Sequence, residues 1–192
     1  MKRQSRRATY EDIERLPEHL NGELIDGELF VSPRPAGPHT FASSGLGYEL
    51  IGPFQRGLRG PGGWWIVDEP ELHFGEDVLV PDLAGWRQER MAVYPRDAYV
   101  TLAPDWVCEV LSPSTAVLDR KLKLQRYARA EVRGVWLIDP ALKTLEVLRL
   151  ERGHWMLLDT YSHLDRVRAE PFEAVELDLS SLWLPEVHDS AG

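Results

Sequence analysis

Two acidic residues of this sequence stand inside apolar stretches, where a carboxylate is costly. In residues 105–114, DWVCEVLSPS, Glu109 interrupts a run that otherwise fits a buried strand ended by a turn. Because side chains of a strand alternate between its two faces, Glu109 shares the inward face of Val107 and Leu111. A buried carboxylate loses hydration worth several kcal/mol unless a cation, a hydrogen bond or protonation compensates. The sequence therefore requires a partner for Glu109.

Asp82 lies in a similar setting, VLVPDLAGW, and we expect it on a neighbouring strand. Taken alone, either acid could pair with an arginine or cap a backbone amide. Together, two carboxylates on neighbouring strands repel each other, and a divalent cation is a common way of stabilising both. Ligands that are all oxygen, completed by water and a substrate phosphate, suit Mg²⁺ or Mn²⁺ rather than zinc. Such a cation can acidify a water and stabilise charge on a phosphate being cut, so the two acids indicate phosphodiester hydrolysis.

This chemistry also needs an ammonium group close to the acids. Asp119, Lys123 and Tyr127 are spaced by four residues on a predicted helix, which places them along one slowly rotating stripe. Lys123 could reach back over the end of the Glu109 strand to orient a water or to steady developing negative charge. From the residues alone, a surface pair between Asp119 and Lys123, worth a few tenths of a kcal/mol, is the slightly better explanation.

The first half of the chain carries signals for a helix, a hairpin and a second helix. Residues 9–17 resemble a capped helix that ends at a proline, and residues 22–33 form two short strands around an Asp-Gly turn. Residues 38–58 have helical spacing of apolar side chains, weakened by glycines and a Gly-Pro pair. Residues 64–86 are rich enough in β-branched and aromatic side chains for strands.

The second half has stronger signals. The Glu109 strand ends in a helix-capping Ser-Pro-Ser-Thr, a helix runs from about Ala116 to Ala130, and the apolar strand GVWLIDP follows. Residues 144–161 add two antiparallel strands. A helix between two apolar strands is typical of a crossover unit, so we expect an α/β fold of mixed α+β type, with a mixed central sheet flanked by helices. No repeat or linker divides the chain, which predicts a single domain over residues 1–192.

Composition restricts the class of protein. The 192 residues are 43% hydrophobic and 28% charged, as in ordinary globular proteins, and no segment reaches the about 18 apolar residues of a membrane helix. The single cysteine, Cys108, lies in an apolar run, which is compatible with a reducing compartment. We therefore expect a cytoplasmic protein with no membrane partner. The sequence has no Walker loop, dinucleotide fingerprint, zinc spacing or nucleophile elbow.

The charge is unevenly distributed. A net charge of -9 argues against a protein that simply coats nucleic acid, because such affinity comes from Lys and Arg. Residues 120–133, however, hold six of the 22 basic side chains and only one acid. A local basic face on an acidic body is one interpretation, and a solvated helix face is the more common one.

The order of these motifs resembles the Uma-type family of restriction endonucleases, within the restriction-endonuclease-like superfamily whose pattern is PD followed by (D/E)XK. The resemblance runs from Glu23 to Leu150. The motifs that carry it are Pro81-Asp82, Glu109-Val110-Leu111 before Ser112-Pro113-Ser114, then Asp119, Lys123 and Tyr127, and GVWLIDP. The resemblance implies a restriction-endonuclease-like core, Asp82 and Glu109 as ligands of Mg²⁺ or Mn²⁺, and the Val110 carbonyl as a third ligand.

The sequence departs from the superfamily pattern at its usual lysine, two residues after the second acid, which is Leu111 here. Families of this type supply the amine from the following helix, so Lys123 is the candidate and Lys121 the runner-up. Glu23 is similar to an acid near the metal, and His39 to a histidine that could contact substrate. A surface acid of the hairpin and a helix-capping histidine are the alternatives.

The sequence therefore predicts a Mg²⁺-dependent endonuclease that hydrolyses DNA, with Asp82, Glu109 and Lys123 as catalytic residues and Tyr127 as a further candidate. Phosphate contacts are expected from three basic side chains of the helix, Arg120, Lys121 and Arg126. A homodimer is expected, because two related sites are the simplest way to cut both strands of a duplex. The alternative is a nuclease fold kept as a binding or assembly module without turnover, and a nuclease of RNA or branched DNA is a third hypothesis.

Overall fold

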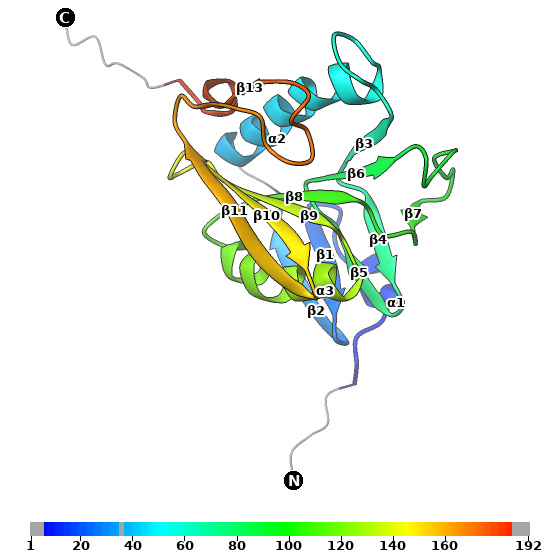
Figure 1. The fold of residues 1–192 in the computed structure, drawn as a ribbon. Helices are drawn as coiled ribbons and strands as arrows, with labels where there is room; N and C mark the ends of the chain where they lie inside the picture. The colour runs from blue at the N-terminus through cyan, green and yellow to red at the C-terminus, as the bar shows by residue number, and fades with distance from the viewer. Residues whose placement is uncertain (1–5, 35–36, 186–192) are drawn as a thin grey trace, which may run out of the picture.

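The computed structural model describes residues 6–34 and 37–185, and its largest unit is a six-stranded sheet (Figure 1). The strands of this sheet are β3 (Trp64–Asp68), β6 (Leu83–Arg87), β8 (Trp106–Val110), β9 (Gly134–Asp139), β10 (Thr144–Glu151) and β11 (His154–Ser162). Their order is β11-β10-β9-β8-β6-β3. Only β8 and β9 run parallel, and the other neighbours are antiparallel. The predicted mixed sheet and its crossover unit are confirmed.

The predicted helix after β8 is confirmed, and it contains a π-helical segment that follows Ala116 and Val117. Leu118–Lys123 (η2) has the wider π turn, and Leu124–Arg129 (α3) continues as an α-helix. A step of four residues exceeds one α turn of about 3.6 residues but falls short of the wider π turn. The step from Asp119 to Lys123 therefore falls slightly short of a full turn, and the step from Lys123 to Tyr127 slightly exceeds one. The two rotations offset each other, so the three side chains stay on one buried face of the helix.

A second sheet, which the sequence analysis did not anticipate, has five strands in the order β2-β1-β5-β4-β7. Its strands are β1 (Leu20–Ile25), β2 (Glu28–Pro33), β4 (Glu71–Phe74), β5 (Asp77–Leu79) and β7 (Tyr99–Val100). The predicted hairpin forms β1 and β2, and its two turn residues, Asp26 and Gly27, have φ of 55° and 78°. Glycine and aspartate adopt this left-handed conformation more readily than other residues, which is why the Asp-Gly pair places the turn here.

The remaining elements pack around the two sheets. They are α1 (Tyr10–Glu14), α2 (Gly37–Leu50), its π-helical continuation η1 (Ile51–Gln55), the short strands β12 (Arg166–Val167) and β13 (Leu177–Asp178), and the 3-10 helix η3 (Leu179–Leu182). Of these, α1 packs against β1 of the five-stranded sheet. The predicted weakness at Gly52-Pro53 coincides with the change from α to π geometry, because a proline has no N–H for the helix. Within the described part of the chain, no helix has the length and apolar character needed to span a membrane.

The central strands separate two hydrophobic cores. On one face, Trp106 and Trp136 pack with Leu50 and Phe54 of the α2–η1 helix and with the C-terminal segment. On the other face, the alternate residues of the same strands, such as Val107, pack with α3 and the five-stranded sheet. Figure 1 shows α2 and β13 together on one side of the sheet and α3 on the other. Both faces of β8 are therefore buried, which explains its nearly continuous apolar sequence.

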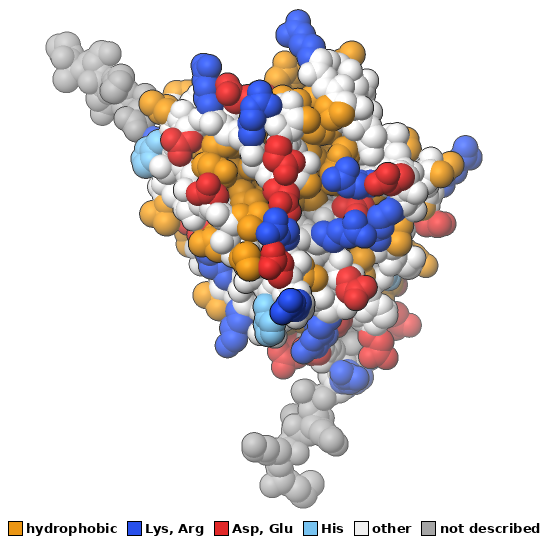
Figure 2. Space-filling model, in the orientation of Figure 1, with side chains coloured by type: hydrophobic (Ala, Val, Ile, Leu, Met, Phe, Trp, Pro, Cys, Tyr) orange, Lys and Arg blue, Asp and Glu red, His pale blue; other side chains and the backbone are white. Residues whose placement is uncertain are grey.

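The outer surface mixes charges of both signs. Figure 2 shows acidic and basic side chains interspersed on one face, with hydrophobic side chains over the β10–β11 hairpin. Met156 and Leu157 of this hairpin are 44% and 55% exposed. A few exposed apolar side chains such as these are ordinary for a protein surface.

Phe172 occupies the centre of an aromatic cluster. Its ring centroid lies 4.7 Å from that of Phe54, 4.9 Å from those of Trp64 and Trp106, and 5.5 Å from that of Trp136. The ring belongs to the segment between β12 and β13, so it packs this C-terminal segment against the aromatic side chains of β3, β8 and β9.

We predict that Phe172→Ala lowers the free energy of unfolding by about 3–5 kcal/mol, because it leaves a cavity between four aromatic rings. Phe172→Leu retains most of the apolar volume and should lose clearly less. Urea unfolding followed by tryptophan fluorescence measures both. Equal unfolding midpoints for wild type and Phe172→Ala would contradict the central place of this ring.

Candidate active site

A cleft of about 270 Å³ opens beside the C-terminal end of β8. Among the described residues, five carboxylates line it, Glu23, Glu69, Asp82, Glu109 and Asp119. Three basic side chains also line it, Arg34, His39 and Lys123. These residues come from β1, the end of β2, the start of α2, the turn after β3, the turn before β6, β8 and η2. The cleft thus brings together most of the residues that the sequence analysis selected.

The buried charge of Glu109 is balanced by the helix that follows it. Glu109 is 2% exposed, and each of its carboxylate oxygens lies 2.9 Å from Nζ of Lys123. The Tyr127 hydroxyl donates a hydrogen bond to Oε1 of the same carboxylate. Lys123 and Tyr127 are themselves buried. The surface pair between Asp119 and Lys123 that the sequence favoured is therefore wrong, because both residues face the protein interior.

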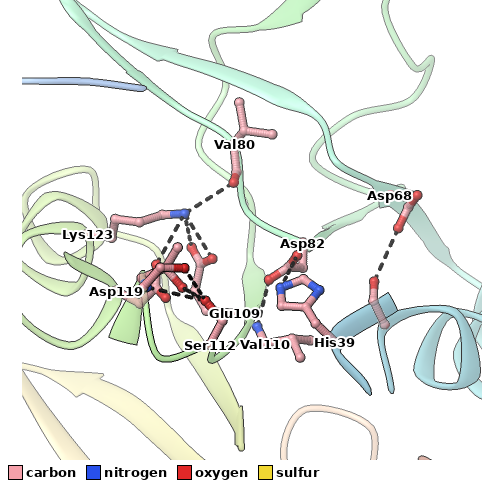
Figure 3. A network of polar contacts seen from close by, with 12 residues as sticks. His39, Asp68, Val80, Asp82, Glu109, Val110, Ser112, Asp119 and Lys123 are labelled. Atoms are coloured by element: carbon pink, nitrogen blue, oxygen red, sulfur yellow. Dashed lines mark hydrogen bonds and ion pairs between the residues drawn. The ribbon is translucent and has the colours of Figure 1, made fainter. Parts of the chain in front are cut away.

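Oxygen atoms surround the Lys123 ammonium group (Figure 3). Besides Glu109, Nζ lies 2.9 Å from Oε1 of Glu23, 3.1 Å from the Val80 carbonyl oxygen and 3.7 Å from Oδ1 of Asp119. Burial alone would lower the pKa of Lys123, but the negative charges around it, that of Glu109 first, raise this pKa well above its ordinary value. The amine is therefore held as a cation.

Burial raises the pKa of Glu109 well above its usual range, and the repulsion from Asp119, Asp82 and Glu23 adds to this effect. Lys123 acts in the opposite direction. Burial also raises the pKa of Asp119. The cluster therefore carries more carboxylates than the one buried ammonium neutralises.

Asp82 lies one residue before β6, at a bend, so the prediction that it lies on a strand is wrong. The preceding Pro81 has no N–H to donate to a ladder, which favours this irregular backbone. Oδ2 of Asp82 accepts a hydrogen bond of 2.7 Å from the backbone N–H of Val110, and Oδ1 lies 3.1 Å from Nε2 of His39. The first contact holds the two predicted acids on adjacent stretches of backbone.

His39, near the start of α2, faces Asp82 rather than only capping its helix. Burial alone would lower the pKa of His39, but the hydrogen bond to Asp82 and its charge raise this pKa above the ordinary value. An imidazolium at this place would stabilise the Asp82 carboxylate.

Sequence reasoning missed two acids at the end of β3. Asp68 accepts a hydrogen bond of 3.5 Å from the Ser43 hydroxyl, and Glu69 lines the cleft. Partial burial raises the pKa of both Asp68 and Glu69, and the charge of Asp82 adds to each. The antiparallel pairing of β3 with β6, which sets Asp68 opposite Leu83, brings these acids beside Asp82. The Asp-Glu-Pro stretch after an apolar run was the available signal.

The basic residues expected to contact phosphate lie away from the cleft lining. Arg120 forms two contacts of 2.7 and 2.8 Å with Glu146, and Arg126 pairs with Asp26 and, at 3.1 Å, with Asp77. Lys121 is exposed. Arg34, which the sequence analysis did not select, lines the cleft instead.

The residues of the cleft fit a hard divalent cation in their chemistry. Asp82 and Glu109 offer carboxylate oxygens, Val110 lines the same cleft, and the cluster carries surplus negative charge. No group of three or more His, Cys, Asp or Glu among residues 6–34 and 37–185 forms a metal cage by itself. Mg²⁺ is usually bound by one or two carboxylates, with water and substrate phosphate as the other ligands, so the pair of acids is sufficient.

We predict that Tyr127→Phe lowers the free energy of unfolding by about 1–3 kcal/mol, because a buried oxygen of Glu109 loses one of its two donors. Tyr48→Phe is the matched control, since Tyr48 is 81% exposed and its change should stay within about 0.5 kcal/mol. Urea unfolding of the three proteins tests this. Equal stability of the two variants would show that the Tyr127 hydroxyl does not support Glu109.

We also predict that Asp68→Asn stabilises the protein at neutral pH by a few tenths of a kcal/mol. Because the pKa of Asp68 is raised in the folded state, its ionisation costs the folded protein more than the unfolded chain. The protonated Asp68 side chain contributes fully to the stability of the folded protein below the ordinary aspartate pKa, about 4. This contribution is lost as pH rises through the raised pKa. Melting temperatures at pH 4 and pH 7.5 should therefore diverge between wild type and variant as pH rises, with exposed Asp97→Asn as the control. A variant less stable than wild type at pH 7.5 would contradict the prediction.

Comparison with known proteins bears on the fold and the family of the chain. A solved structure described as "a putative nuclease belonging to DUF820 from Anabaena variabilis ATCC 29413" superposes with a TM-score of 0.70 at 23% sequence identity. The match covers 91% of this chain and 96% of that chain, and at this identity it shows a shared fold. No curated protein matches the chain. The family model Uma2, described as "Putative restriction endonuclease", matches residues 8–180. The chain belongs to the Uma2 family.

Proposed function

We propose that this protein is a metal-dependent endonuclease that hydrolyses phosphodiester bonds of DNA. Membership of the Uma2 family supports a nuclease-like function. The observation that carries the proposal is the convergence of Asp82, Glu109 and Lys123 on one cleft, from positions far apart in the chain. Two carboxylates and an ammonium in one cleft are the groups that phosphodiester hydrolysis assisted by a cation needs.

Asp82 and Glu109 would hold Mg²⁺ or Mn²⁺, with the Val110 carbonyl as the proposed third ligand. When bound, such a cation lowers the pKa of a water molecule and stabilises negative charge on the scissile phosphate. The residues of the chain prepare this site. The Val110 N–H and His39 orient Asp82, and Tyr127 orients Glu109.

Lys123 would steady the negative charge that develops on the phosphate, in place of the superfamily lysine that Leu111 replaces. Its raised pKa keeps the ammonium charged at neutral pH. Glu23 is not a surface acid of the hairpin. Its Oε1 lies 2.9 Å from Nζ of Lys123 and accepts a hydrogen bond of 2.8 Å from the Val80 N–H, so it supports Lys123. Lys121 is the less suitable amine, because it is exposed.

DNA binding is proposed to begin at the mouth of the cleft. Arg34 lines this cleft, and we propose that its guanidinium contacts phosphate. Arg120 and Arg126 would first have to leave their carboxylate partners, so we propose that they contribute less than the sequence alone indicates. A homodimer would present two clefts to a duplex. A cytoplasmic location is proposed because the one cysteine is a buried free thiol.

A second candidate function is a binding or assembly module without turnover. One observation favours it. Lys123 and Tyr127 already satisfy the Glu109 carboxylate, so this carboxylate has hydrogen-bond partners without a cation. A fold kept only for binding would have the same internal pairing.

We predict that wild type cleaves supercoiled plasmid with Mn²⁺, and that Asp82→Asn, Glu109→Gln and Lys123→Ala each reduce the rate about 100-fold or more. The reason is the loss of transition-state stabilisation of at least ~3 kcal/mol. Exposed Asp97→Asn and Glu89→Gln are matched controls and should cleave as wild type does. Quantified nicking and linearisation on agarose gels gives the rates.

Equal cleavage by all six proteins would place the activity outside this cleft. An inactive wild type that still binds Mn²⁺ would favour the binding module.

A further inference from the structure

We propose that Lys123 is an internal counter-ion that competes with the divalent cation for Glu109, so that the cation binds by displacing the ammonium from this carboxylate. The inference rests on the proposed role of Asp82 and Glu109 as cation ligands. It adds an event that the proposed function does not require, which is the release of Glu109 by Lys123.

The first argument is the number of oxygens around the ammonium. An ammonium has three N–H donors, but four oxygens lie within 3.1 Å of Nζ, two from Glu109, one from Glu23 and one from Val80. Figure 3 shows Nζ pointing into this group of oxygens. Lys123 can therefore give up one oxygen of Glu109 and still use all its donors.

The second argument is the occupancy of Glu109. Each carboxylate oxygen has two lone pairs, and Oε1 already accepts from Tyr127 and contacts Lys123. Oε2 contacts Lys123 as well. A divalent cation on this carboxylate must therefore either use the one remaining lone pair of Oε2 beside a buried ammonium, or replace the ammonium. Two cations so close in a buried site repel strongly, which favours replacement.

The third argument is that the displaced amine has other partners. Glu23 is fixed by the Val80 N–H at 2.8 Å, and it holds Lys123 independently of Glu109. Asp119, which precedes Lys123 by four residues on the same helix, lies 3.7 Å from Nζ. Lys123 would thus move toward Glu23 and Asp119 and stay beside the reacting phosphate, while Tyr127 keeps Glu109 in place.

The test compares Mn²⁺ binding by wild type, Lys123→Met and Lys121→Met, measured by isothermal titration calorimetry without DNA. Lys123→Met keeps the apolar stem and removes the charge, so its Mn²⁺ dissociation constant should fall about tenfold or more below that of wild type. Its melting temperature should be lower than that of wild type without metal, and should rise more on addition of Mn²⁺. Lys121→Met removes an exposed ammonium from the same helix and should bind Mn²⁺ as wild type does.

A second measurement uses only the wild type and so does not depend on the folding of a variant. The chain has four lysines, so the side-chain ammonium signals of ¹⁵N-lysine-labelled protein can be assigned individually. Titration with diamagnetic Mg²⁺ should shift the Lys123 signal saturably and leave the Lys121 signal unchanged.

An unshifted Lys123 signal at saturating Mg²⁺ would overturn the proposal, and so would a folded Lys123→Met that binds Mn²⁺ no more tightly than wild type. Neither result bears on DNA cleavage, so a wild type that cuts plasmid would keep its proposed function. Conversely, tighter binding by Lys123→Met in a protein that cuts no DNA would support the counter-ion and reject the nuclease.

Discussion

The buried ion pair between Glu109 and Lys123 is the constraint on which the rest of the structure depends. A buried carboxylate near the end of a central strand is tolerated because the next helix supplies an ammonium beside it. Lys123 ends the π-helical segment of that helix, and Tyr127, four residues further along, donates to the same carboxylate. Replacing Lys123 alone would leave the Glu109 charge uncompensated in the core, which makes this pair more demanding than an apolar contact of the same size.

The cleft is built from a local excess of negative charge. Burial and mutual repulsion raise the pKa of Glu109, Asp119, Asp68 and Glu69, and the one buried ammonium does not neutralise all of them. Clusters of this kind store unfavourable electrostatic energy, and a bound cation or a proton relieves it. The same feature suits a metal-dependent hydrolase and explains why an acidic protein would need local cations, such as Arg34, to approach a phosphate.

Much of the fold follows from patterns that are local in sequence. The Asp-Gly turn predicts the first hairpin, and apolar runs with capping residues predict β8, its helix and β9. The second sheet could not be predicted, because its short strands depend on partners chosen in three dimensions. The same limit applies to the site. Glu109 and Lys123 belong to one local unit, whereas Asp68 reaches Asp82 only through the pairing of β3 with β6. The partner of Arg120, Glu146, is equally remote from any local pattern.

Asp82 is oriented by the peptide N–H of Val110 rather than by a side chain alone. A backbone donor is present whatever residue occupies the position, so substitutions at Val110 that keep the strand also keep this bond. The orientation of Asp82 is thus set by the backbone of β8. Many of the side chains around the cleft could therefore change during evolution, and with them the molecules that the cleft accepts, while the orientation of the Asp82 carboxylate stays the same.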